Sequence, residues 1–406
     1  MVQLRQGGEK VLEGGEPEVL AADFGRFGEV AVIDLDAAMG VAGNDALIAP
    51  LLRLADCRLG GGIRSAEQAG RLVSLGAQKI IVGSSAFRVD GGFGVNVPFL
   101  RAVSQRIGRE RLVVAVDTRG GSVVVDGWKT DTGLDLIEAA KAVEPFAGEL
   151  LFTCVEREGT LSGIDLEPVR RLRSAVSCGV TVAGGVSSVN EIAKIAALGC
   201  DVQLGMALYT GGINLPDAFV ASLDWNKGLL PVIVQSRDGQ VLMTGVTDRE
   251  ALHETFRRGN VCFHSRRRGG LWMKGETSGN TLKFARVRAD CDRDALLVTA
   301  EPAGPVCHTG AWSCFSTGRN FSWQFLQEIV AGRLKDPAPG SYTATLDDEL
   351  VREKIMEEAD EVCRASGRNE IVSEAADLLY FATVLLSRAG VEVGEVLDEL
   401  DRRHKK

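Results

Sequence analysis

The stretch "GGVSS" at Gly184–Ser188 repeats the stretch "GGIRS" at Gly61–Ser65, far upstream in the chain. Nearly the same offset separates "VGSSAF", which starts at Val82, from "LGMALY", which starts at Leu204. Two related halves with Gly-rich turns indicate a (β/α)₈ barrel that carries two phosphate sites at its carboxyl-end mouth. Glycines in such turns allow backbone N–H groups and helix N-termini to approach phosphate oxygens.

Short apolar runs alternate with amphipathic stretches of helical period on both sides of this repeat. The runs begin at Val30, Cys57, Lys79, Leu112, Leu150, Val180 and Asp201. Seven βα units of this kind predict a parallel α/β fold. The segment "VAVDTRGGSVVVDGW" from Val114 should have a mate ending in "MVQLRQGG" at Met1, so the strand that would precede it lies before Met1. We therefore expect a (β/α)₈-type barrel over residues 1–226 with its first strand apparently missing.

The bulk composition describes a soluble protein of several domains. The chain has 406 residues, of which 45% are hydrophobic and 25% charged, and two to three domains are expected. A net charge of −9 argues against a general nucleic-acid surface. No apolar run is long enough to span a membrane, and the N-terminus lacks a signal-peptide core. Nine scattered cysteines favour a reducing compartment, by default the cytoplasm.

The pattern of apolar and polar residues changes twice after the barrel segment. Residues 229–318 alternate short strand candidates with turn residues, which predicts an α+β domain. Residues 321–406 follow a helical pattern with two strongly amphipathic segments, which predicts an all-α domain. Three domains are therefore expected.

The segment "DCDRDALLV" from Asp290 carries three aspartates at every second position. If it is a strand, Asp290, Asp292 and Asp294 share one face and Cys291 lies on the other. Three carboxylates so close repel one another unless a cation lies among them.

Two further segments of the second domain carry unusual chemistry. "WMKGETSGN" (Trp272–Asn280) groups Lys, Glu, Thr, Ser and Asn around two glycines, which suits either a phosphate and ribose site or a polar surface loop. "GPVCHTGAWSCF" contains Cys307 and Cys314, with His308 beside the first. The spacing is not that of a standard zinc finger, and the pattern alone favours buried cysteines over metal ligands.

Acidic residues recur at helical spacing near the C-terminus. "KIMEEADE" places Glu358 and Glu361 on one helix face, and "SEAADLLYF" places Glu374 and Asp377 on another. The two faces could converge on Mg²⁺, although acidic helix faces are mostly solvated. Apolar neighbours such as Leu378 place these acids next to a core.

These motifs, together with "PVIVQSRDGQVLMTGVTDREAL" from Pro231, closely resemble the phosphoribosyl-AMP cyclohydrolase family over residues 229–315. The resemblance implies Zn²⁺ held by Cys291, Cys307 and Cys314, with ligands shared across a homodimer interface. It also implies Mg²⁺ held by Asp290, Asp292 and Asp294. The implied substrate contacts are Trp272, Lys274, Glu276, Ser278 and Asn280, with Lys274 also a catalytic candidate. His264 departs from the family, which more often has an aromatic residue there.

The implied chemistry is the opening of an adenine ring. An adenine ribosylated on N1 has an electrophilic C6, and three thiolates would leave a fourth zinc position for water. Zinc-activated water would then attack C6. His308 is the candidate proton shuttle, or alternatively only supports a ligand through a hydrogen bond.

Residues 325–404, including "GSYTATL" from Gly340, resemble the phosphoribosyl-ATP pyrophosphohydrolase family, which is all-α and Mg²⁺-dependent. The resemblance implies that the acids bind Mg²⁺ and position water, with Glu358 and Glu361 catalytic. The implied ligands are Glu357, Glu358, Glu361, Glu374 and Asp377. The implied phosphate contacts are Ser341, Tyr342, Thr343 and Lys354.

The barrel segment resembles the phosphoribosylformimino-AICAR-phosphate isomerase family through "GGGIRS", "IIVGSSA", "VDTRGG", "EREGTL" and "AGGVSS". The implied phosphate contacts are Gly61, Gly62, Gly83, Ser84, Gly184, Gly185 and Gly205. Asp117, Thr153 and Trp128 match the family site, whereas Glu158 stands where aspartate is usual. The catalytic candidates that the resemblance carries over to this chain are Asp117 and Glu158.

The other key aspartate of that family belongs to the strand before Met1. Either the barrel is degenerate, or the true start lies upstream and Met1 is internal. We expect histidine biosynthesis steps 2 and 3, with a barrel that binds phosphates without catalysing. The alternatives are a trifunctional enzyme and a barrel that is a non-catalytic structural or ligand-binding module, which aids dimerisation or retains the ring-opened product.

Overall fold

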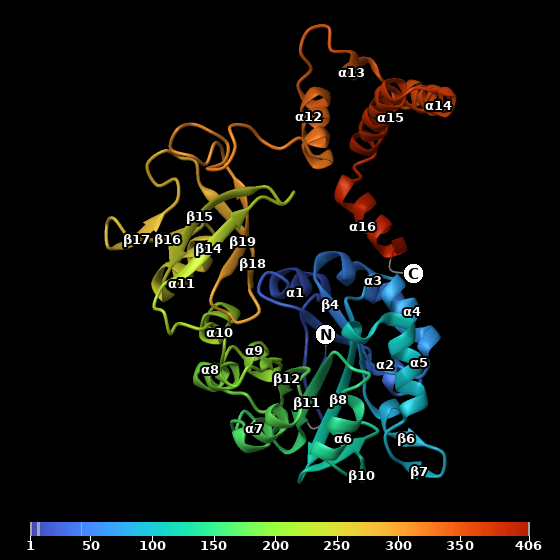
Figure 1. The fold of residues 1–406 in the computed structure, drawn as a ribbon, viewed down its shortest axis with the longest axis vertical. Coiled ribbons are helices and arrows are strands. Elements are labelled where there is room, and N and C mark those ends of the chain that lie inside the picture. The colour runs from blue at the N-terminus through green and yellow to red at the C-terminus, as the bar shows by residue number, and fades with distance from the viewer. Residues whose placement is uncertain (1, 6–8, 42, 405–406) are drawn as a thin grey trace. The chain divides into compact units, whose positions relative to one another are not determined.

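The computed structural model describes residues 2–5, 9–41 and 43–404, which form two compact units (Figure 1). The first unit holds the chain up to Arg237 together with Val241–Phe315. The second unit holds Asp238–Gln240 together with Ser316–His404. No helix in this described part is both long and apolar enough to cross a membrane.

Seven parallel strands form the sheet of the N-terminal part, in the order β13-β12-β11-β8-β5-β4-β3. Their bounds are β3 (Val30–Ile33), β4 (Cys57–Gly60), β5 (Lys79–Val82), β8 (Leu112–Arg119), β11 (Glu149–Cys154), β12 (Gly179–Ala183) and β13 (Asp201–Val202). Each strand coincides with one of the seven predicted runs, which confirms the parallel α/β fold. In the described ranges no strand joins β3 to β13, so the sheet is the expected incomplete barrel.

Helices follow most of these strands and lie on the outside of the sheet (Figure 1). They are α1 (Pro17–Phe24), α2 (Leu35–Ala38), α3 (Asp45–Leu54), α4 (Ala66–Ser74), α5 (Val97–Ile107), α6 (Leu136–Val143), α7 (Leu166–Ala175), α8 (Val189–Ala197), α9 (Met206–Tyr209) and α10 (Leu215–Ser222). Three antiparallel additions complete this part. They are the pair β1 (Val2–Arg5) with β2 (Glu9–Glu13), the pair β6 (Arg88–Val89) with β7 (Gly92–Phe93), and β9 (Ser122–Val125) with β10 (Thr130–Asp135), of which β9 also pairs with β8.

Alternation along the strands divides the barrel core into two layers. On β8, Val114 and Val116 belong to the large cluster shared with the helices. Val113 and Ala115 belong to a second cluster with Leu151 and other strand residues only. Successive side chains of a strand point to opposite faces, so the second cluster is the inner layer of the sheet.

A buried ionic network lies at the amino ends of the strands. Arg58 and Glu149 are only 7% and 6% exposed, and Arg58 Nη1 lies 2.5 Å from Glu149 Oε1. Lys79 Nζ donates to Glu149 Oε2 at 2.9 Å, and Thr181 donates to the same carboxylate. Burial opposes ionisation of Glu149, but Arg58 and Lys79 outweigh it and lower the pKa of Glu149.

The central part is an α+β structure, as predicted. Its sheet has the order β15-β14-β19-β18, in which only β14 and β19 are parallel. The strands are β14 (Leu230–Gln235), β15 (Val241–Thr247), β18 (Leu282–Ala289) and β19 (Leu296–Pro302). The hairpin of β16 (Cys262–Ser265) and β17 (Gly270–Met273) and the helix α11 (Arg249–Arg258) complete it.

One hydrophobic core crosses from the barrel into the central part. Phe27 and Phe219 of the barrel pack in the same cluster as Phe256 and Phe284 of the central part. The ring centroids of Phe27 and Phe256 are 5.1 Å apart, and those of Phe256 and Phe284 are 5.2 Å apart. The backbone N–H of Val287 donates to the carbonyl oxygen of Arg26 at 2.9 Å. The barrel and the central part therefore share buried side chains and backbone hydrogen bonds.

The second unit is helical, which confirms the all-α expectation. Its helices are α12 (Trp323–Lys335), α13 (Tyr342–Thr345), α14 (Asp348–Arg364), α15 (Arg368–Arg388) and α16 (Val393–His404). The core consists of Val330, Leu346, Val351, Phe381 and Val384. Long antiparallel contact between α14 and α15 places acids of both helices opposite one another.

Candidate functional site

The acidic segment at Asp290–Asp294 is a turn between β18 and β19, so the predicted strand is wrong. β18 ends at Ala289, and β19 begins only at Leu296. Asp290 Oδ1 accepts hydrogen bonds from the backbone N–H groups of Asp294 and Ala295 at 3.0 and 3.1 Å. Aspartate favours turns because its side chain can bond nearby backbone in this way. The separation of Asp and Cys faces by strand alternation therefore does not apply.

The turn nevertheless brings the three carboxylates together. One oxygen each of Asp290, Asp292 and Asp294 lies within 4.8 Å of the others. Lys227 forms an ion pair with Asp294, so a cationic group already lies at the edge of this acidic loop. Clustered carboxylate oxygens are the donor set that Mg²⁺ prefers, and the loop fits such an ion in its chemistry.

Two of the three predicted zinc ligands lie together. The thiols of Cys307 and Cys314 are within hydrogen-bonding reach of each other. Thr309 Oγ1 donates to Cys307 Sγ at 3.1 Å, and this hydrogen bond lowers the pKa of the Cys307 thiol. Burial raises the pKa of Cys314. Among the described side chains Cys291 does not join them in a metal-sized group of three.

The predicted shuttle and the predicted lysine both lie beside these thiols. His308 Nδ1 is 3.8 Å from Cys307 Sγ, and the His308 side chain is exposed. Lys274 is only 8% exposed, and burial lowers its pKa. Both thiols interact electrostatically with Lys274. The thiol pair, Lys274 and His308 therefore form one constellation.

The polar segment after β17 is a turn, as its glycines predict. Gly275 has φ +83°, and a Cβ there would come within 2.4 Å of the backbone of Asn280. Glu276 pairs with Arg268 of the neighbouring hairpin, and Ser278 Oγ accepts from the backbone N–H of Asn280. Glu276 and Ser278 are exposed, so their side chains remain open to a ligand. Trp272 instead packs against Phe263, with ring centroids 5.8 Å apart.

The C-terminal acids converge across α14 and α15. One carboxylate oxygen each of Glu358, Glu374 and Asp377 lies within 4.8 Å of the others. Glu358 is only 7% exposed, and burial together with Glu361 and Asp377 raises its pKa. Burial and a hydrogen bond with Glu361 raise the pKa of Glu374. This helical cluster fits a divalent cation, because such an ion would relieve the repulsion.

Other predicted residues of this unit lie outside the cluster. Glu357 is exposed and accepts a hydrogen bond from Lys354 at 2.5 Å. Thr343 is 2% exposed and shares a hydrogen bond with Tyr380, so its hydroxyl is occupied inside the unit. Tyr342 is 51% exposed, and Ser341 directly precedes α13.

The matching residues of the barrel meet at the carboxyl ends of β8 and β11. Trp128 Nε1 donates to Asp117 Oδ2 at 2.7 Å, and Thr153 also hydrogen-bonds Asp117. Burial raises the pKa of Asp117, although these hydrogen bonds act the other way. Burial, with the nearby Asp117 carboxylate, raises the pKa of Glu158. The two acids are therefore neighbours.

The repeated glycines form tight turns after β4 and β12. Gly61 has φ +98°, and a Cβ there would lie 2.2 Å from the Asp34 carbonyl oxygen. Each turn leads to a serine that caps the next helix, Ser65 for α4 and Ser188 for α8. The remaining predicted phosphate contacts also follow strands at this mouth. They are Gly62, Gly83 and Ser84 in one half and Gly184, Gly185 and Gly205 in the other.

Three family models match the chain in sequence order. The model described as "Histidine biosynthesis protein" covers residues 1–214, which is more than half of the chain. "Phosphoribosyl-AMP cyclohydrolase" covers residues 243–316, and "Phosphoribosyl-ATP pyrophosphohydrolase" covers residues 324–404. The chain belongs to the histidine biosynthesis protein family. This confirms all three resemblances.

Similar proteins of the histidine biosynthesis family match about half of this chain. A "Histidine biosynthesis bifunctional protein HisIE" of Xanthomonas campestris is 45% identical over 193 residues, covering 45% of this chain and 94% of the relative. The protein of that name from Escherichia coli K12 is 42% identical over 195 residues, covering 45% and 96%. That of Pyrococcus furiosus is 40% identical over 206 residues, covering 47% and 99%. The match covers nearly the full length of each of these relatives, so too few residues are left in them for a barrel.

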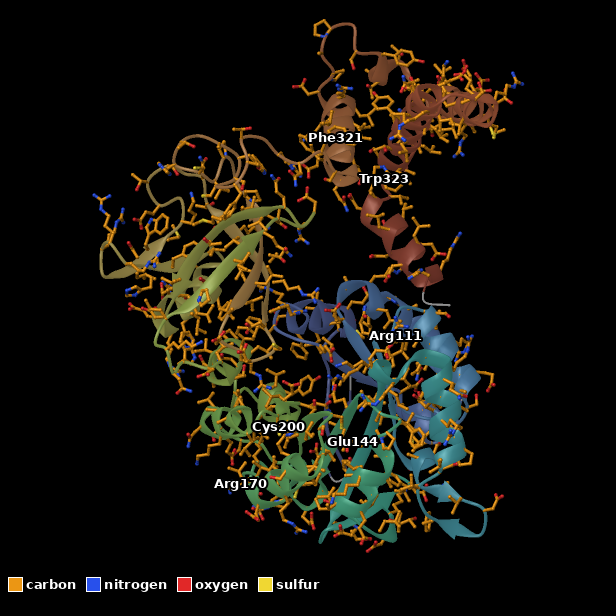
Figure 2. The ribbon with its side chains drawn as sticks, in the orientation of Figure 1. Arg111, Glu144, Arg170, Cys200, Phe321 and Trp323 are labelled. Carbon is orange, nitrogen blue, oxygen red and sulfur yellow. The ribbon has the colours of Figure 1, made fainter. Side chains whose placement is uncertain are left out.

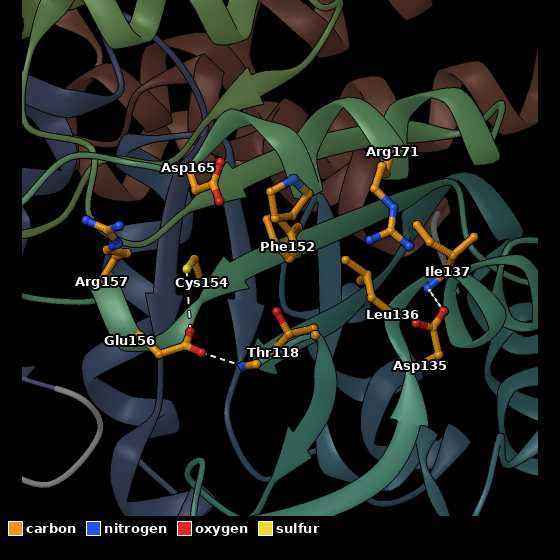
Figure 3. Close-up of a pocket in the computed structure, with 13 residues that line it drawn as sticks. Thr118, Asp135, Leu136, Ile137, Phe152, Cys154, Glu156, Arg157, Asp165 and Arg171 are labelled. Atoms are coloured by element: carbon orange, nitrogen blue, oxygen red, sulfur yellow. Dashed lines mark hydrogen bonds between the residues drawn. The ribbon is translucent and has the colours of Figure 1, made fainter.

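Sequence reasoning missed a pocket in the barrel of this histidine biosynthesis protein. A cavity of about 390 Å³ lies beside the carboxyl ends of β8 and β11, and Figure 3 shows the residues that line it. Thr118, Phe152 and Cys154 line it, whereas Asp117 and Thr153 alternate to the opposite face. Glu156 accepts a hydrogen bond from the Gly120 backbone N–H and another from the Cys154 thiol at 3.6 Å. The pocket therefore lies on the helix side of the sheet, away from the acid pair.

Proposed function

We propose that this histidine biosynthesis protein hydrolyses phosphoribosyl-ATP to phosphoribosyl-AMP and pyrophosphate, and then opens the adenine ring of phosphoribosyl-AMP. The observation that carries the proposal is that each matched hydrolase region contains its own group of three converging carboxylates. One group lies on the acidic loop and the other in the helical cluster. The two reactions follow in sequence, because the first product is the second substrate.

The helical cluster suits pyrophosphate release. Mg²⁺ bound there would neutralise polyphosphate charge and orient the scissile group. Glu358 is buried with a raised pKa, so its carboxylate is placed to accept a proton from the attacking water. Lys354 lies beside Glu357 and near Tyr342, where its ammonium can contact a phosphate.

The thiol constellation suits the ring opening. Zn²⁺ held by three thiolates would leave one position for water and lower the pKa of that water. Thr309 stabilises the thiolate of Cys307 through its hydrogen bond, which favours a metal ligand at that position. His308 is exposed next to Cys307, so its imidazole can carry the proton from the water to the ring nitrogen as the bond between N1 and C6 breaks.

We also propose that two copies of the chain complete each zinc site. Cys307 and Cys314 meet within one chain, whereas Cys291 does not reach them there. A Cys291→Ala chain mixed with a Cys307→Ala chain tests this, because a mixed dimer would hold one intact set of three thiols. Regained ring opening is expected. Failure of the mixture, with both variants folded, would contradict the shared site.

We propose that the barrel does not isomerise the ring-opened product. Isomerisation needs an acid and a base on opposite sides of the sugar, and the chain offers Asp117 together with Glu158, which stands where the family has aspartate. Another acid, Asp34, directly follows β3, but hydrogen bonds from Ala37 and Asn44 occupy its carboxylate. Accumulation of the ketose isomer from ring-opened product would support the trifunctional alternative instead.

The central test feeds phosphoribosyl-ATP to the purified full chain. The expected products are pyrophosphate and the ring-opened nucleotide. Cys314→Ala should stop the sequence at phosphoribosyl-AMP, and Glu374→Gln should block the first step. Ring opening by the Cys314→Ala protein at the original rate would overturn the assignment of the thiols.

The setting of the reaction is also a proposal. All nine cysteines are free thiols, which favours a reducing compartment such as the cytoplasm. The net charge of −9 makes small phosphorylated nucleotides, held by local positive groups, better ligands than nucleic acid.

A further inference from the structure

Arg293, in the middle of the acidic loop, is attached to the barrel. Its guanidinium donates to the carbonyl oxygens of Ala196 at 3.1 Å and of Cys200 at 2.9 Å. It also forms an ion pair with Asp201 at 2.7 Å. Cys200, labelled in Figure 2, lies between the end of α8 and the start of β13. Only 18% of the Arg293 side chain is exposed, so most of it is covered.

The barrel end that receives Arg293 suits a cation. Ala196 lies in the last turn of α8, where helix carbonyl groups carry a partial negative charge. A guanidinium offers several donors in one plane and can bond two carbonyl groups and a carboxylate together. The backbone of the loop is attached as well, since the Arg293 carbonyl oxygen accepts from the Asp224 N–H at 2.9 Å.

The backbone at Arg293 needs support from its contacts. Its φ of +62° lies in the left-handed region, which is unfavourable for residues with a side chain. The neighbours on either side, Asp292 and Asp294, carry two of the three converging carboxylates. The conformation at Arg293 therefore contributes, with the hydrogen bonds to Asp290, to the direction of the Asp292 carboxylate relative to that of Asp294.

We propose that the barrel acts as a scaffold for the acidic loop, with Arg293 as the positioning residue that holds Asp290, Asp292 and Asp294 ready for a divalent cation. The proposal rests on the proposed Mg²⁺ role of this loop. It gives the barrel a function that needs no chemistry at the barrel mouth.

The test compares full-length variants in ring opening of phosphoribosyl-AMP, which bypasses the helical cluster. Arg293→Ala removes the anchor, and Arg293→Gly removes it while suiting the left-handed backbone. Asp201→Asn removes only the charge partner. Arg26→Ala is the matched control, because Arg26 also crosses the junction, to the carbonyl oxygen of Ala285, but away from the loop.

Two quantities are measured for each variant. One is the Mg²⁺ concentration that gives half-maximal ring opening. The other is hydrogen exchange of the Asp294 and Ala295 amides with and without Mg²⁺, which does not depend on activity. A purely structural role would lower kcat or stability without moving either Mg²⁺ dependence.

We expect Arg293→Ala and Arg293→Gly to need about tenfold more Mg²⁺, with kcat restored at saturating Mg²⁺. Their loop amides should exchange faster without the ion, Asp201→Asn should be intermediate, and Arg26→Ala should match the unaltered chain. Equal Mg²⁺ requirements in all variants would overturn the anchor. If the unaltered chain shows no Mg²⁺ response in either readout, the metal role of the loop fails and the anchor fails with it.

Discussion

The acidic loop and the helical cluster reach the same arrangement by different means. Both bring three carboxylate oxygens within 4.8 Å of one another. In the helical cluster, the regular spacing of α14 and α15 fixes the positions of the acids. In the loop, hydrogen bonds from Asp294 and Ala295 to Asp290 fix them, with Arg293 held by a distant part of the chain. A regular element carries its own geometry, whereas a loop takes its geometry from its contacts.

The two clusters also differ in how they tolerate their charge. Glu358 is buried, and mutual repulsion contributes to raised pKa values of Glu358 and Glu374. Asp290 and Asp292 are exposed to water, and Lys227 pairs with Asp294. Removing a charge should therefore have opposite side effects, relieving repulsion in the helices and weakening the fold of the loop.

The largest expected effect is in the helical cluster. Glu374→Gln should lower pyrophosphate release from phosphoribosyl-ATP about a hundredfold or more, because it removes one of three converging ligands. The thermal midpoint without metal should rise, because like-charge repulsion falls. Asp360→Asn, on α14 but paired with Arg364, is the control. A normal rate in the Glu374→Gln protein would show that the cluster is not the site.

In the loop, Asp292→Asn should raise the Mg²⁺ requirement of ring opening about tenfold or more. Bound zinc, measured by metal analysis, should stay nearly stoichiometric. Asp290→Asn should act more strongly, since Asp290 also accepts the two backbone hydrogen bonds. Loss of zinc together with Mg²⁺ dependence would show that the two metals are not held independently.

Acidification should distinguish the helical cluster from the acidic loop. The pKa values of Glu358 and Glu374 lie above the ordinary 4.5, so these groups take up protons earlier than ordinary glutamates as the pH falls. Protons then compete with Mg²⁺, and the half-saturating Mg²⁺ for pyrophosphate release should rise, by about tenfold per pH unit for each proton displaced.

The stability of the metal-free protein should rise over the same pH range in which Mg²⁺ binding weakens. A folded-state carboxyl pKa above the unfolded value means that the folded state binds more protons, so stability rises as the pH falls from the raised pKa toward 4.5. Thermal melts without metal at several pH values measure this. A midpoint that only falls on acidification would contradict the repulsion in the cluster.

The smallest expected effect comes from Lys227→Ala. The exposed Lys227 ammonium pairs with Asp294 and competes with a bound cation. Its removal should lower the half-saturating Mg²⁺ for ring opening by about two- to threefold, as expected for an exposed ion pair. Lys283→Ala, which removes an exposed pair with Glu301, should leave it unchanged. A higher Mg²⁺ requirement in Lys227→Ala would mean that Lys227 holds the loop.

The sequence predicted best where geometry is local. The seven barrel strands and the faces of α14 and α15 follow from periods of 2 and 3.6 residues, which are set by the backbone alone. Glu358, Glu374 and Asp377 were predicted as converging acids for this reason, and they converge. Glu357 is on the same helix but turned toward Lys354, a difference of one position that the pattern did not resolve.

Prediction from the sequence failed where contacts between residues far apart in the chain decide the local structure. Alternation in "DCDRD" looks like a strand, yet the turn is fixed by the left-handed Arg293 and by its bonds to Ala196 and Cys200 in the barrel. The network of Arg58 with Glu149 likewise joins residues with no shared local pattern. The grouping of Cys291 with Cys307 and Cys314 across two copies of the chain stays a prediction, because Cys291 does not join the other two thiols within one chain.

The aromatic core between the barrel and the central part has a consequence for synthesis on the ribosome. Phe27 and Phe219 are made before Phe256 and Phe284, the rings that cover them. At ordinary translation rates, synthesis from Phe219 to Phe284 takes on the order of 3 to 13 seconds. During that time the Phe27 and Phe219 rings are exposed to solvent and to chaperones. A nascent chain stalled in this interval therefore presents an apolar patch that the finished protein conceals.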